Sequence, residues 1–279
     1  MTLPLGMICS IIILLVWSRT HRELNSPGRL LHRALNKRQL CVHYQPIIDI
    51  KNNQCVGAEA LLRWPGFNGQ VMSPAEFIPL AESEGMSERI TDYVVEEVFN
   101  DLGHFLAEHP HLYISINLSA TDFHSSRLIA MISDKARHYA VRAQQIKIEV
   151  TERGFIDVPK TTPVIQAFRQ AGYEVAIDDF GTGYSNLHNL YSLNVDILKI
   201  DKVFIDMLPE DVSMVPAMIQ LARGLSLRIV AEGVENDAQR RWLQAAGVEV
   251  LQGHLFGCAL PQEAFSARYL SPVREDENL

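Results

Sequence analysis

The sequence predicts an α/β fold, a (βα)8 TIM-like barrel in which one strand runs antiparallel to the other seven. It contains eight short, apolar, β-prone segments, and after the first two these alternate with helical segments, as in a parallel sheet. The turn at Asn52-Asn53 joins the first two segments and is too short to connect parallel strands. The chain of 279 residues is long enough, since such barrels commonly use about 250 residues. A doubly wound open sheet is the alternative, weakened by the lack of a GxGxxG phosphate loop.

The expected strands and helices follow from the apolar pattern and from helix start and stop signals. The strands are expected at residues 42–50, 54–62, 112–117, 146–150, 174–178, 197–200, 228–231 and 248–252. Helices are expected at residues 29–40, 90–106, 163–171, 212–221 and 237–246, with a charged helical stretch after residue 117. Ser73-Pro74-Ala75-Glu76 is typical of a capping box with proline at the first helical position. Gly172, Gly224 and Gly247 are expected to end three of the helices.

Composition and charge limit the classes of partner. The net charge is −8, but residues 1–38 hold six basic residues and one acidic residue, so the remainder is strongly acidic. An acidic body is a poor non-specific binder of DNA or RNA polymers, and an anionic ligand would need metal ions or a few placed cations. The four cysteines show no CxxC pattern, which favours reduced thiols in a reducing compartment.

The N-terminal segment suggests a membrane anchor. Residues 3–17 are mostly apolar and uncharged, although 15 residues are fewer than the ~20 that span a bilayer comfortably. A signal peptide is disfavoured, because no Lys or Arg precedes the segment and no small-residue cleavage site follows Trp17. We expect an anchor over residues 1–18 and a basic juxtamembrane linker over 19–38, with the N-terminus outside and the barrel in the cytoplasm. The alternatives are the stub of a longer membrane region or a misassigned start.

Polar side chains stand at or just after the carboxyl ends of most predicted strands. Asp178-Asp179 is the clearest case, because two adjacent carboxylates end an apolar run and a loop with Gly181 and Gly183 follows. The complete set is Glu59, Asn117, Glu149 with Glu152, Asp178 with Asp179, Lys199 with Asp201, Glu232 with Glu235, and Gln252. In a barrel these strand ends share one face, and that face carries the active site.

Each of these residues also has a purely structural interpretation. Asn117 and Asp201 could cap helices, and Glu235 could be an ordinary first-turn charge. Lys199 could be a buried cation paired with Asp201, and Asp178-Asp179 could lie in a solvated turn. Packing alone would place apolar or capping groups at these positions, so the joint pattern favours a ligand site.

The donor set indicates hard metal ions. It consists of carboxylate and amide oxygens, and no His or Cys group has zinc spacing. Oxygen sites suit Mg²⁺ or Mn²⁺, and several carboxylates at one barrel mouth suit two ions. Two ions about 4 Å apart are a standard device for hydrolysing phosphodiesters. A lysine among the acids can hold the attacking water or a phosphoryl oxygen.

Several motifs together carry a resemblance to a known family. They are Tyr44-Gln45-Pro46-Ile47, Glu59-Ala60-Leu61, Asn117-Leu118-Ser119, Glu149-Val150-Thr151-Glu152, Asp178-Asp179-Phe180-Gly181-Thr182-Gly183, Leu198-Lys199-Ile200-Asp201, Ala231-Glu232-Gly233-Val234-Glu235 and Gln252-Gly253. The chain resembles the EAL-domain phosphodiesterases, which hydrolyse cyclic di-GMP to linear 5'-pGpG. The resemblance implies a domain over residues 39–271, followed by a tail over 272–279, and a (βα)8 barrel with one antiparallel strand.

The resemblance also implies roles for individual residues. The implied metal ligands are Glu59, Asn117, Glu149 and Asp178, with Asp178, Asp179 and Glu232 serving a second Mg²⁺ or Mn²⁺ ion. The implied catalytic residues are Lys199, which positions the attacking water, Glu232 and Glu59. The implied substrate contacts are Arg63 at the phosphate together with Gln45, Asp201, Glu235 and Gln252. Glu152 resembles the residue that anchors the loop over residues 179–185.

The chain departs from the family pattern at two places. His254 stands where the family usually has an aromatic residue, and Cys258-Ala259 replaces a common Lys-Pro pair. These departures put substrate affinity in question more than catalysis. The alternative function is a catalytically impaired cyclic di-GMP-binding receptor or a membrane-bound interaction module. The resemblance further implies a homodimer. With the N-terminal segment, it gives the expectation of a single-pass protein of the bacterial inner membrane.

Overall fold

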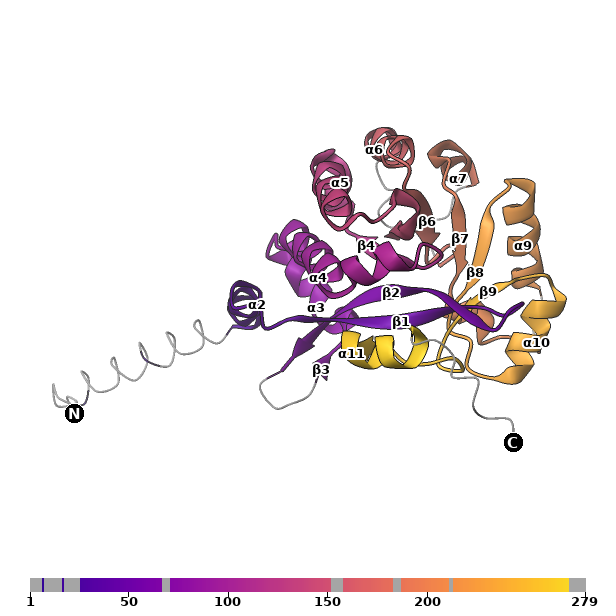
Figure 1. Ribbon diagram of the computed structural model, residues 1–279, viewed down its shortest axis with the longest axis horizontal. Helices are drawn as coiled ribbons and strands as arrows, with labels where there is room; N and C mark the ends of the chain where they lie inside the picture. The colour runs from indigo at the N-terminus through magenta and orange to yellow at the C-terminus, as the bar shows by residue number, and fades with distance from the viewer. Residues whose placement is uncertain are drawn as a thin grey trace, which may run out of the picture. The chain divides into compact units, whose positions relative to one another are not determined.

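The computed structural model describes residues 26–66, 71–151, 158–182, 187–210 and 213–270, together with Met7 and Trp17 (Figure 1). The chain divides into two compact units, one of Met1–Cys41 with Arg63–Ser87 and the other of Val42–Leu62 with Glu88–Leu279. Within the described part, no helix is both long and apolar enough to cross a membrane. Apart from Met7 and Trp17, the expected anchor over residues 1–18 lies outside the described residues, so it stays a prediction.

The smaller unit contains the helices α2 (Pro27–Asn36) and α3 (Pro74–Ser83), the short strand β3 (Val71–Met72) and the end of β2. The predicted capping box is confirmed, because the Ser73 backbone N–H donates to Glu76 Oε2 over 2.6 Å. Trp64 packs edge-on against Phe77, with ring centroids 5.9 Å apart. Helix α2 ends at Asn36 and not at residue 40, and Arg38 takes a left-handed φ of 51° just after it.

The larger unit holds the closed barrel. Its strands are β1 (Cys41–Asp49), β2 (Gln54–Pro65), β4 (Tyr113–Leu118), β5 (Ile146–Thr151), β6 (Glu174–Asp178), β7 (Ile197–Ile200), β8 (Arg228–Ala231) and β9 (Val250–Gln252). Strands β2, β4, β5, β6, β7, β8 and β9 pair in that order and are parallel. Strand β1 pairs with β9 antiparallel and also with β2, which closes the ring. The predicted barrel with one antiparallel strand is therefore confirmed.

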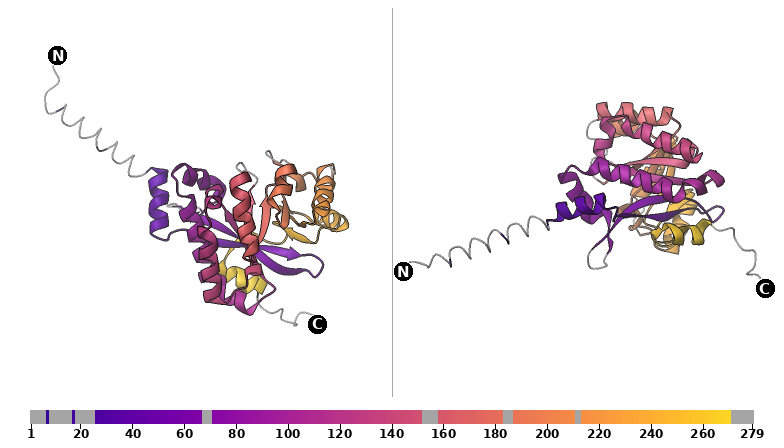
Figure 2. Two further views of the ribbon diagram at one scale, coloured as in Figure 1. Left: turned by 90° about the horizontal axis from the view of Figure 1, so that it is seen from above. Right: turned by 60° about the vertical axis from the view of Figure 1, so that its left-hand side comes forward.

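The helices of this unit lie around the outside of the strands (Figures 1 and 2). They are α4 (Ser87–Glu108), α5 (Arg127–Tyr139), α6 (Val158–Gln170), α7 (Leu187–Leu193), α9 (Met214–Gly224) and α10 (Asp237–Ala245). The short helices α8 (Lys202–Ile205) and α11 (Gln262–Phe265) and the strand β10 (Leu260–Pro261) complete the unit. On α4, the fully buried Val95, Val98, Phe99 and Leu102 recur at helical spacing and form one apolar stripe against the core.

Three elements differ from their sequence predictions for identifiable reasons. Helix α6 begins at Val158 and carries Pro163 inside it, whereas the sequence predicts a helix that starts at Pro163. Helix α8 has four residues, too few for a helical period to be recognised. Helix α7 has seven residues, which is also short for a periodic signal.

The barrel interior carries charged side chains at both ends. Lys147 precedes Glu149 by two residues on β5, so the two side chains lie on the same face of the strand. The ammonium of Lys147 is buried, 3.2 Å above the centre of the Tyr113 ring and 3.6 Å from Glu174 Oε2. Burial, followed by the charge of Arg228, lowers the pKa of Lys147 to about 8. The amino end of the barrel is therefore polar as well as the carboxyl end.

Replacing Gly253 with alanine is expected to lower the free energy of unfolding by about 1–3 kcal/mol. A Cβ at Gly253 would lie 2.2 Å from the carbonyl oxygen and 2.3 Å from the nitrogen of Val234, and backbone atoms cannot turn aside as a side chain can. Urea unfolding measures the change. Gly224→Ala is the control, because a Cβ there meets no atom within 4 Å. Equal unfolding midpoints for the two variants would contradict the expected clash.

Candidate functional site

Lys199 lies at the centre of four carboxylates at the carboxyl ends of the barrel strands. Its side chain is 1% exposed. Its Nζ is 2.6 Å from Glu232 Oε1, 2.7 Å from Glu149 Oε2, 3.3 Å from Asp178 Oδ2 and 3.7 Å from Glu59 Oε2. The Glu149 contact is a hydrogen bond, whereas Glu232 Oε1 is buried without one. The cluster of acids predicted from the strand ends is therefore present as one group around a single buried ammonium.

Two amide side chains fix the carboxylate of Glu59. Asn117 donates through Nδ2 to Glu59 Oε1 over 2.7 Å, and Gln252 donates through Nε2 to Glu59 Oε2 over 2.8 Å. Gln252 Nε2 also lies 3.2 Å from Gln45 Oε1, and Gln45 Nε2 donates to the carbonyl of Gly257 over 3.4 Å. Side chains from strands β1, β2, β4 and β9 thus form one row of hydrogen bonds. In this row the Asn117 side-chain amide donates to Glu59 and does not cap the next helix.

Asp178 and Asp179 take different positions. Asp179 has a left-handed φ of 55°, which Asp tolerates better than most residues, and its N–H donates to Asp178 Oδ1 over 2.9 Å. The carbonyl of Asp179 accepts from the N–H and the hydroxyl of Thr182. Gly181 has φ 96°, as expected of a glycine in this loop, whereas Gly183 lies beyond the described part. Backbone contacts therefore hold Asp179 beside Asp178.

Asp201 and Glu235 lie next to this cluster and have local partners. Asp201 caps α8, because its Oδ1 accepts from the Val203 N–H over 2.9 Å, so the capping interpretation is confirmed. The proposed pair of Asp201 with Lys199 is wrong, because Lys199 pairs with the four acids named above. Glu235 Oε1 is 2.8 Å from Lys202 Nζ, a contact that sequence reasoning missed. The exposed His254 stands 3.8 Å from Glu235 through Nδ1.

Two predicted site residues stand apart from this geometry. Glu152 lies outside the described residues, so its role as a loop anchor stays a prediction. Arg63 belongs to the smaller unit, and its role at the substrate phosphate likewise stays a prediction.

The electrostatics of the cluster are dominated by burial. Burial raises the pKa of Glu149 to about 8, and burial followed by the charge of Asp178 raises the pKa of Glu232 well above its usual range. Burial also raises the pKa of Asp178, and it raises that of Asp179 to about 6 with the help of Asp178. Burial lowers the pKa of Lys199, but the surrounding carboxylates outweigh it and raise that pKa well above its usual value. The single positive charge of Lys199 therefore does not fully balance the negative charges of the surrounding acids.

The donor set fits a hard divalent cation. Single oxygens of Glu59, Glu149 and Asp178 lie within 4.8 Å of one another, and all three residues are buried. These atoms are carboxylate oxygens, the ligands that Mg²⁺, Mn²⁺ and Ca²⁺ take. A cation would also supply the positive charge that the raised pKa values of these acids call for.

In the metal-free protein, the melting temperature is expected to fall as the pH rises from about 5 to about 8. Glu149 has a folded pKa of about 8 against 4.5 in the unfolded chain, so the folded state binds more protons in this window and loses stability as pH rises. Lys199 does not offset this, because its stabilising charge is fully present below its unfolded pKa of 10.5. A loss of ~1 kcal/mol would lower the melting temperature by about 2–4 °C. Calorimetry with chelator measures it.

Saturating Mg²⁺ is the matched condition, because a bound cation favours the ionised acids and should flatten the dependence. The surface acids with lowered pKa, Glu76 and Asp237, titrate below this window and do not mask the effect. A melting temperature that rises from pH 5 to 8 without metal would contradict the expectation.

The family model of the EAL domain matches residues 29–259. The chain belongs to the EAL domain family. The match begins before and ends before the predicted boundaries at residues 39 and 271, which stay predictions. It includes both departures noted in the sequence, His254 and Cys258-Ala259, and Cys258 is exposed beside Gly257, the acceptor for Gln45.

Two curated EAL relatives carry names that refer to cyclic di-GMP. The probable cyclic di-GMP phosphodiesterase PdeB of Escherichia coli (strain K12) is 44% identical over 263 residues, which cover 94% of this chain and 51% of the relative. The bifunctional diguanylate cyclase/cyclic di-GMP phosphodiesterase MucR of Pseudomonas aeruginosa is 36% identical over 242 residues, covering 85% of this chain and 35% of the relative. The chain thus spans about half of the length of PdeB and about a third of the length of MucR.

Solved structures of EAL domains have the same fold. The PaMucR phosphodiesterase in complex with c-di-GMP matches with a TM-score of 0.79 and 36% identity, over 84% of this chain and 97% of that one. The EAL enzyme Bd1971 in its cAMP- and cyclic-di-GMP-bound form matches with a TM-score of 0.81 and 26% identity, over 95% of this chain and 75% of that one.

Proposed function

We propose that this EAL domain hydrolyses cyclic di-GMP to linear 5'-pGpG with the help of Mg²⁺ or Mn²⁺. The observation that carries the proposal is the buried Lys199 within 4 Å of four strand-end carboxylates, three of which offer converging oxygens. Each position that the family resemblance assigns to a metal ligand carries an oxygen donor in this chain. The names of PdeB and MucR support the same substrate.

Two ions at this site would be held by Glu59, Asn117, Glu149, Asp178, Asp179 and Glu232. Divalent cations stabilise charge on phosphoryl oxygens and lower the pKa of water at neutral pH. The chain's own contribution is preorganisation: Asn117 and Gln252 hold both oxygens of Glu59, so this carboxylate need not reorient during the reaction. Lys199 supplies a fixed positive charge for the attacking water or a phosphoryl oxygen, with catalytic roles also proposed for Glu59 and Glu232.

The substrate would contact the residues around this cluster. We propose that Gln45, Asp201, Glu235 and Gln252 line the nucleotide and that Arg63 contacts a phosphate. Gln252 Oε1 is buried without a hydrogen-bond partner among the described residues, so it can accept from a substrate N–H or a water. Lys202 keeps Glu235 in place through its 2.8 Å ion pair.

The test is the conversion of cyclic di-GMP by the purified full chain, followed by chromatography of the linear product. Product is expected with Mg²⁺ or Mn²⁺ and not with chelator. Ca²⁺ is expected to bind without supporting turnover, because its bonds of ~2.4 Å against ~2.1 Å for Mg²⁺ misplace the reacting atoms. Binding of cyclic di-GMP without product under all metals would favour the receptor, and neither binding nor product would favour an interaction module.

We further propose that residues 3–17 tether the protein to the bacterial inner membrane as a single pass, with the EAL domain in the cytoplasm. The basic residues that follow Trp17 support this orientation. A periplasm-active reporter fused after Leu279 should stay inactive, and full-length protein should sediment with membranes. An active reporter would refute the orientation, and full recovery in the soluble fraction would refute the anchor.

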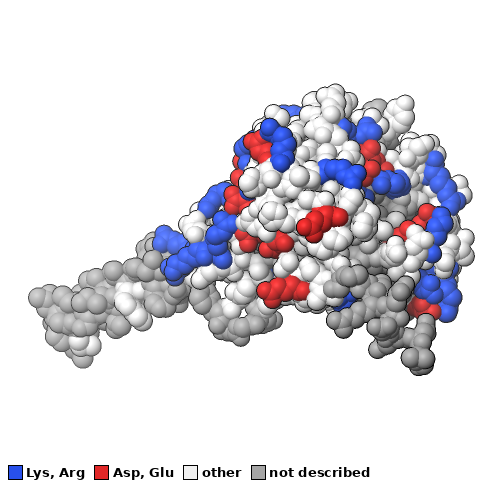
Figure 3. Space-filling view, viewed as in Figure 1, with Lys and Arg blue, Asp and Glu red and all other residues white. Residues whose placement is uncertain are grey.

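A homodimer and the absence of DNA or RNA polymer partners complete the proposal. On the face shown in Figure 3, basic and acidic side chains lie next to one another, as on a surface that does not attract a polyanion. Light scattering with and without cyclic di-GMP tests the dimer.

A further inference from the structure

A cavity lies at the amino ends of the barrel strands, away from the acidic cluster. Its volume is about 380 Å³, within the range of small-molecule pockets. Residues from the starts of β4, β5, β6, β7, β8 and β9 line it, whereas the acidic cluster stands at the carboxyl ends of the same strands. A molecule in this cavity would therefore not occupy the position of the substrate.

The charged lining of this cavity has a surplus of positive charge on one wall. Glu174 Oε1 is 2.6 Å from Arg228 Nη2, and its other oxygen is 3.6 Å from Lys147 Nζ. A separation of 3.6 Å is beyond hydrogen-bond distance. The contact of Glu174 with Arg228 is therefore the closer ion pair, and its contact with Lys147 is the weaker one. Two cations therefore share one carboxylate.

The other acid of the lining leaves this local surplus in place. Asp49 keeps its negative charge, because the donors to its two oxygens, the Lys51 N–H and the Asn52 amide of the β1–β2 turn, are neutral, but among the described residues it forms no ion pair with Lys147 or Arg228. The Lys147 side chain is only 7% exposed, and the Tyr113 ring covers one side of its ammonium. A buried ammonium with unused donors is unfavourable unless a further acceptor reaches it.

The rest of the lining is mainly apolar. It includes Val56, Leu112, Ile197, Ile229, Val230 and Val250. Ile197 and Val230 are almost fully buried and pack with Ala176, and Val250 packs against them, so this wall is firm. A ligand suited to both walls has one anionic end and an apolar body.

We propose that this cavity binds a small organic carboxylate. The carboxylate group would lie between Lys147 and Arg228, where it accepts hydrogen bonds from the N–H donors that Glu174 leaves unused. The apolar part of the ligand would rest on Ile197, Val230 and Val250. The site is separate from the proposed phosphodiesterase site and does not depend on it.

Benzoate is the test ligand, with benzamide and benzylamine as neutral and cationic analogues of the same shape. Binding to the metal-free full chain is followed by ligand-observed NMR near neutral pH, with methyl spectra of the protein to locate it. Benzoate is expected to bind with a dissociation constant on the order of 1 mM, and the two analogues at least ~10-fold more weakly. Methyl signals of Ile197, Ile229 and Val250 are expected to shift.

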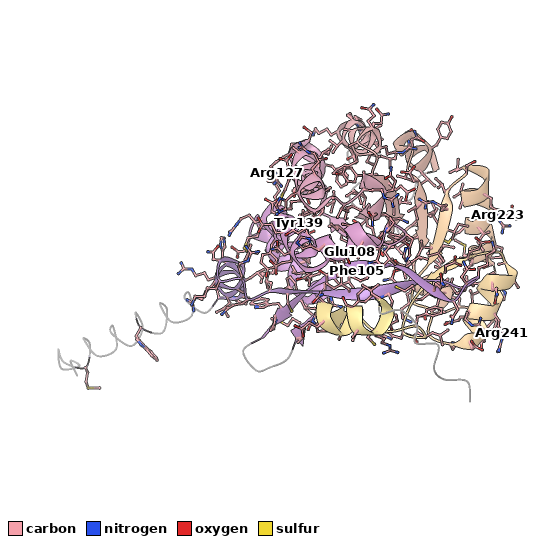
Figure 4. All side chains as sticks on the ribbon, viewed as in Figure 1. Phe105, Glu108, Arg127, Tyr139, Arg223 and Arg241 are labelled. Carbon is pink, nitrogen blue, oxygen red and sulfur yellow. The ribbon has the colours of Figure 1, made fainter. Side chains whose placement is uncertain are left out.

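Lys147→Met and Arg228→Met are each expected to weaken benzoate binding about 10-fold or more, since each removes a charged donor. Arg241→Met is the control, because Arg241 is exposed on α10, pairs with Asp237 and lies outside the cavity (Figure 4). Having two variants keeps the test decisive if one of them fails to fold. Undetectable benzoate binding, equal affinity for benzamide, or full affinity in either variant would overturn the proposal.

Discussion

Replacing Lys199 with methionine is expected to lower the turnover of cyclic di-GMP by at least ~10²-fold. The ammonium is the fixed positive charge among Glu59, Glu149, Asp178 and Glu232, and methionine retains its packing without its charge. The same change leaves buried acids uncompensated, so the metal-free variant is expected to lose ~3–5 kcal/mol of stability. Saturating Mg²⁺ should restore part of that loss.

Product chromatography and urea unfolding with and without Mg²⁺ measure the two effects. Lys51→Met is the matched control, because Lys51 is exposed and pairs only at the surface with Glu249. Turnover within a few-fold of the unchanged protein would remove Lys199 from the mechanism. Normal stability in chelator would show that the four acids are protonated and need no cation.

Replacing Asp178 with asparagine is expected to lower turnover by ~10²–10³-fold, because a ligand to both proposed ions would lose its charge. Asparagine Oδ1 can still accept from the Asp179 N–H, so the loop geometry should survive. The concentration of Mn²⁺ that gives half-maximal activity should rise together with the loss of rate.

Asp134→Asn is the control for Asp178→Asn, since Asp134 is exposed on α5 and pairs with Arg137. Calorimetric titration with Mn²⁺ separates metal affinity from rate. Unchanged Mn²⁺ affinity combined with lost activity would mean that Asp178 acts on the substrate and not on a metal.

Much of the barrel could be predicted from the sequence, because its strands are short apolar runs with clear limits. The predicted strands at 174–178, 197–200 and 228–231 match β6, β7 and β8 residue for residue. Strand β9 was expected from residue 248 and begins at Val250. The hairpin at Asn52-Asn53 was enough to orient β1, since the direction of the other strands follows from their helical connections.

The site could be predicted as a group of residues but not as a set of partners. Topology alone places Glu59, Glu149 and Asp178 at one end of the barrel. Which of them contacts Lys199 depends on side chains that meet across the barrel, and sequence spacing does not contain that information. The pair of Lys202 with Glu235 joins residues far apart in sequence, and the left-handed φ of Asp179 is unusual for a residue other than glycine. Neither the ion pair nor this backbone angle is marked by a short sequence pattern around the residues concerned.

The hydrogen bond between Gln252 and Glu59 bears on how the protein is made. It joins side chains 193 positions apart, and β9, which carries Gln252, is the last strand to enter the ring. During synthesis Glu59 leaves the ribosome early, and Gln252 is added only after most of the domain has been translated. At ~5–20 residues per second this interval lasts tens of seconds when translation is slow. Until then neither β1 nor β8 has β9 to pair with, and two sheet edges stay open to other chains. A nascent chain released before residue 252 would therefore present two unclosed edges, which are targets for chaperones and proteases, and would have no oriented Glu59.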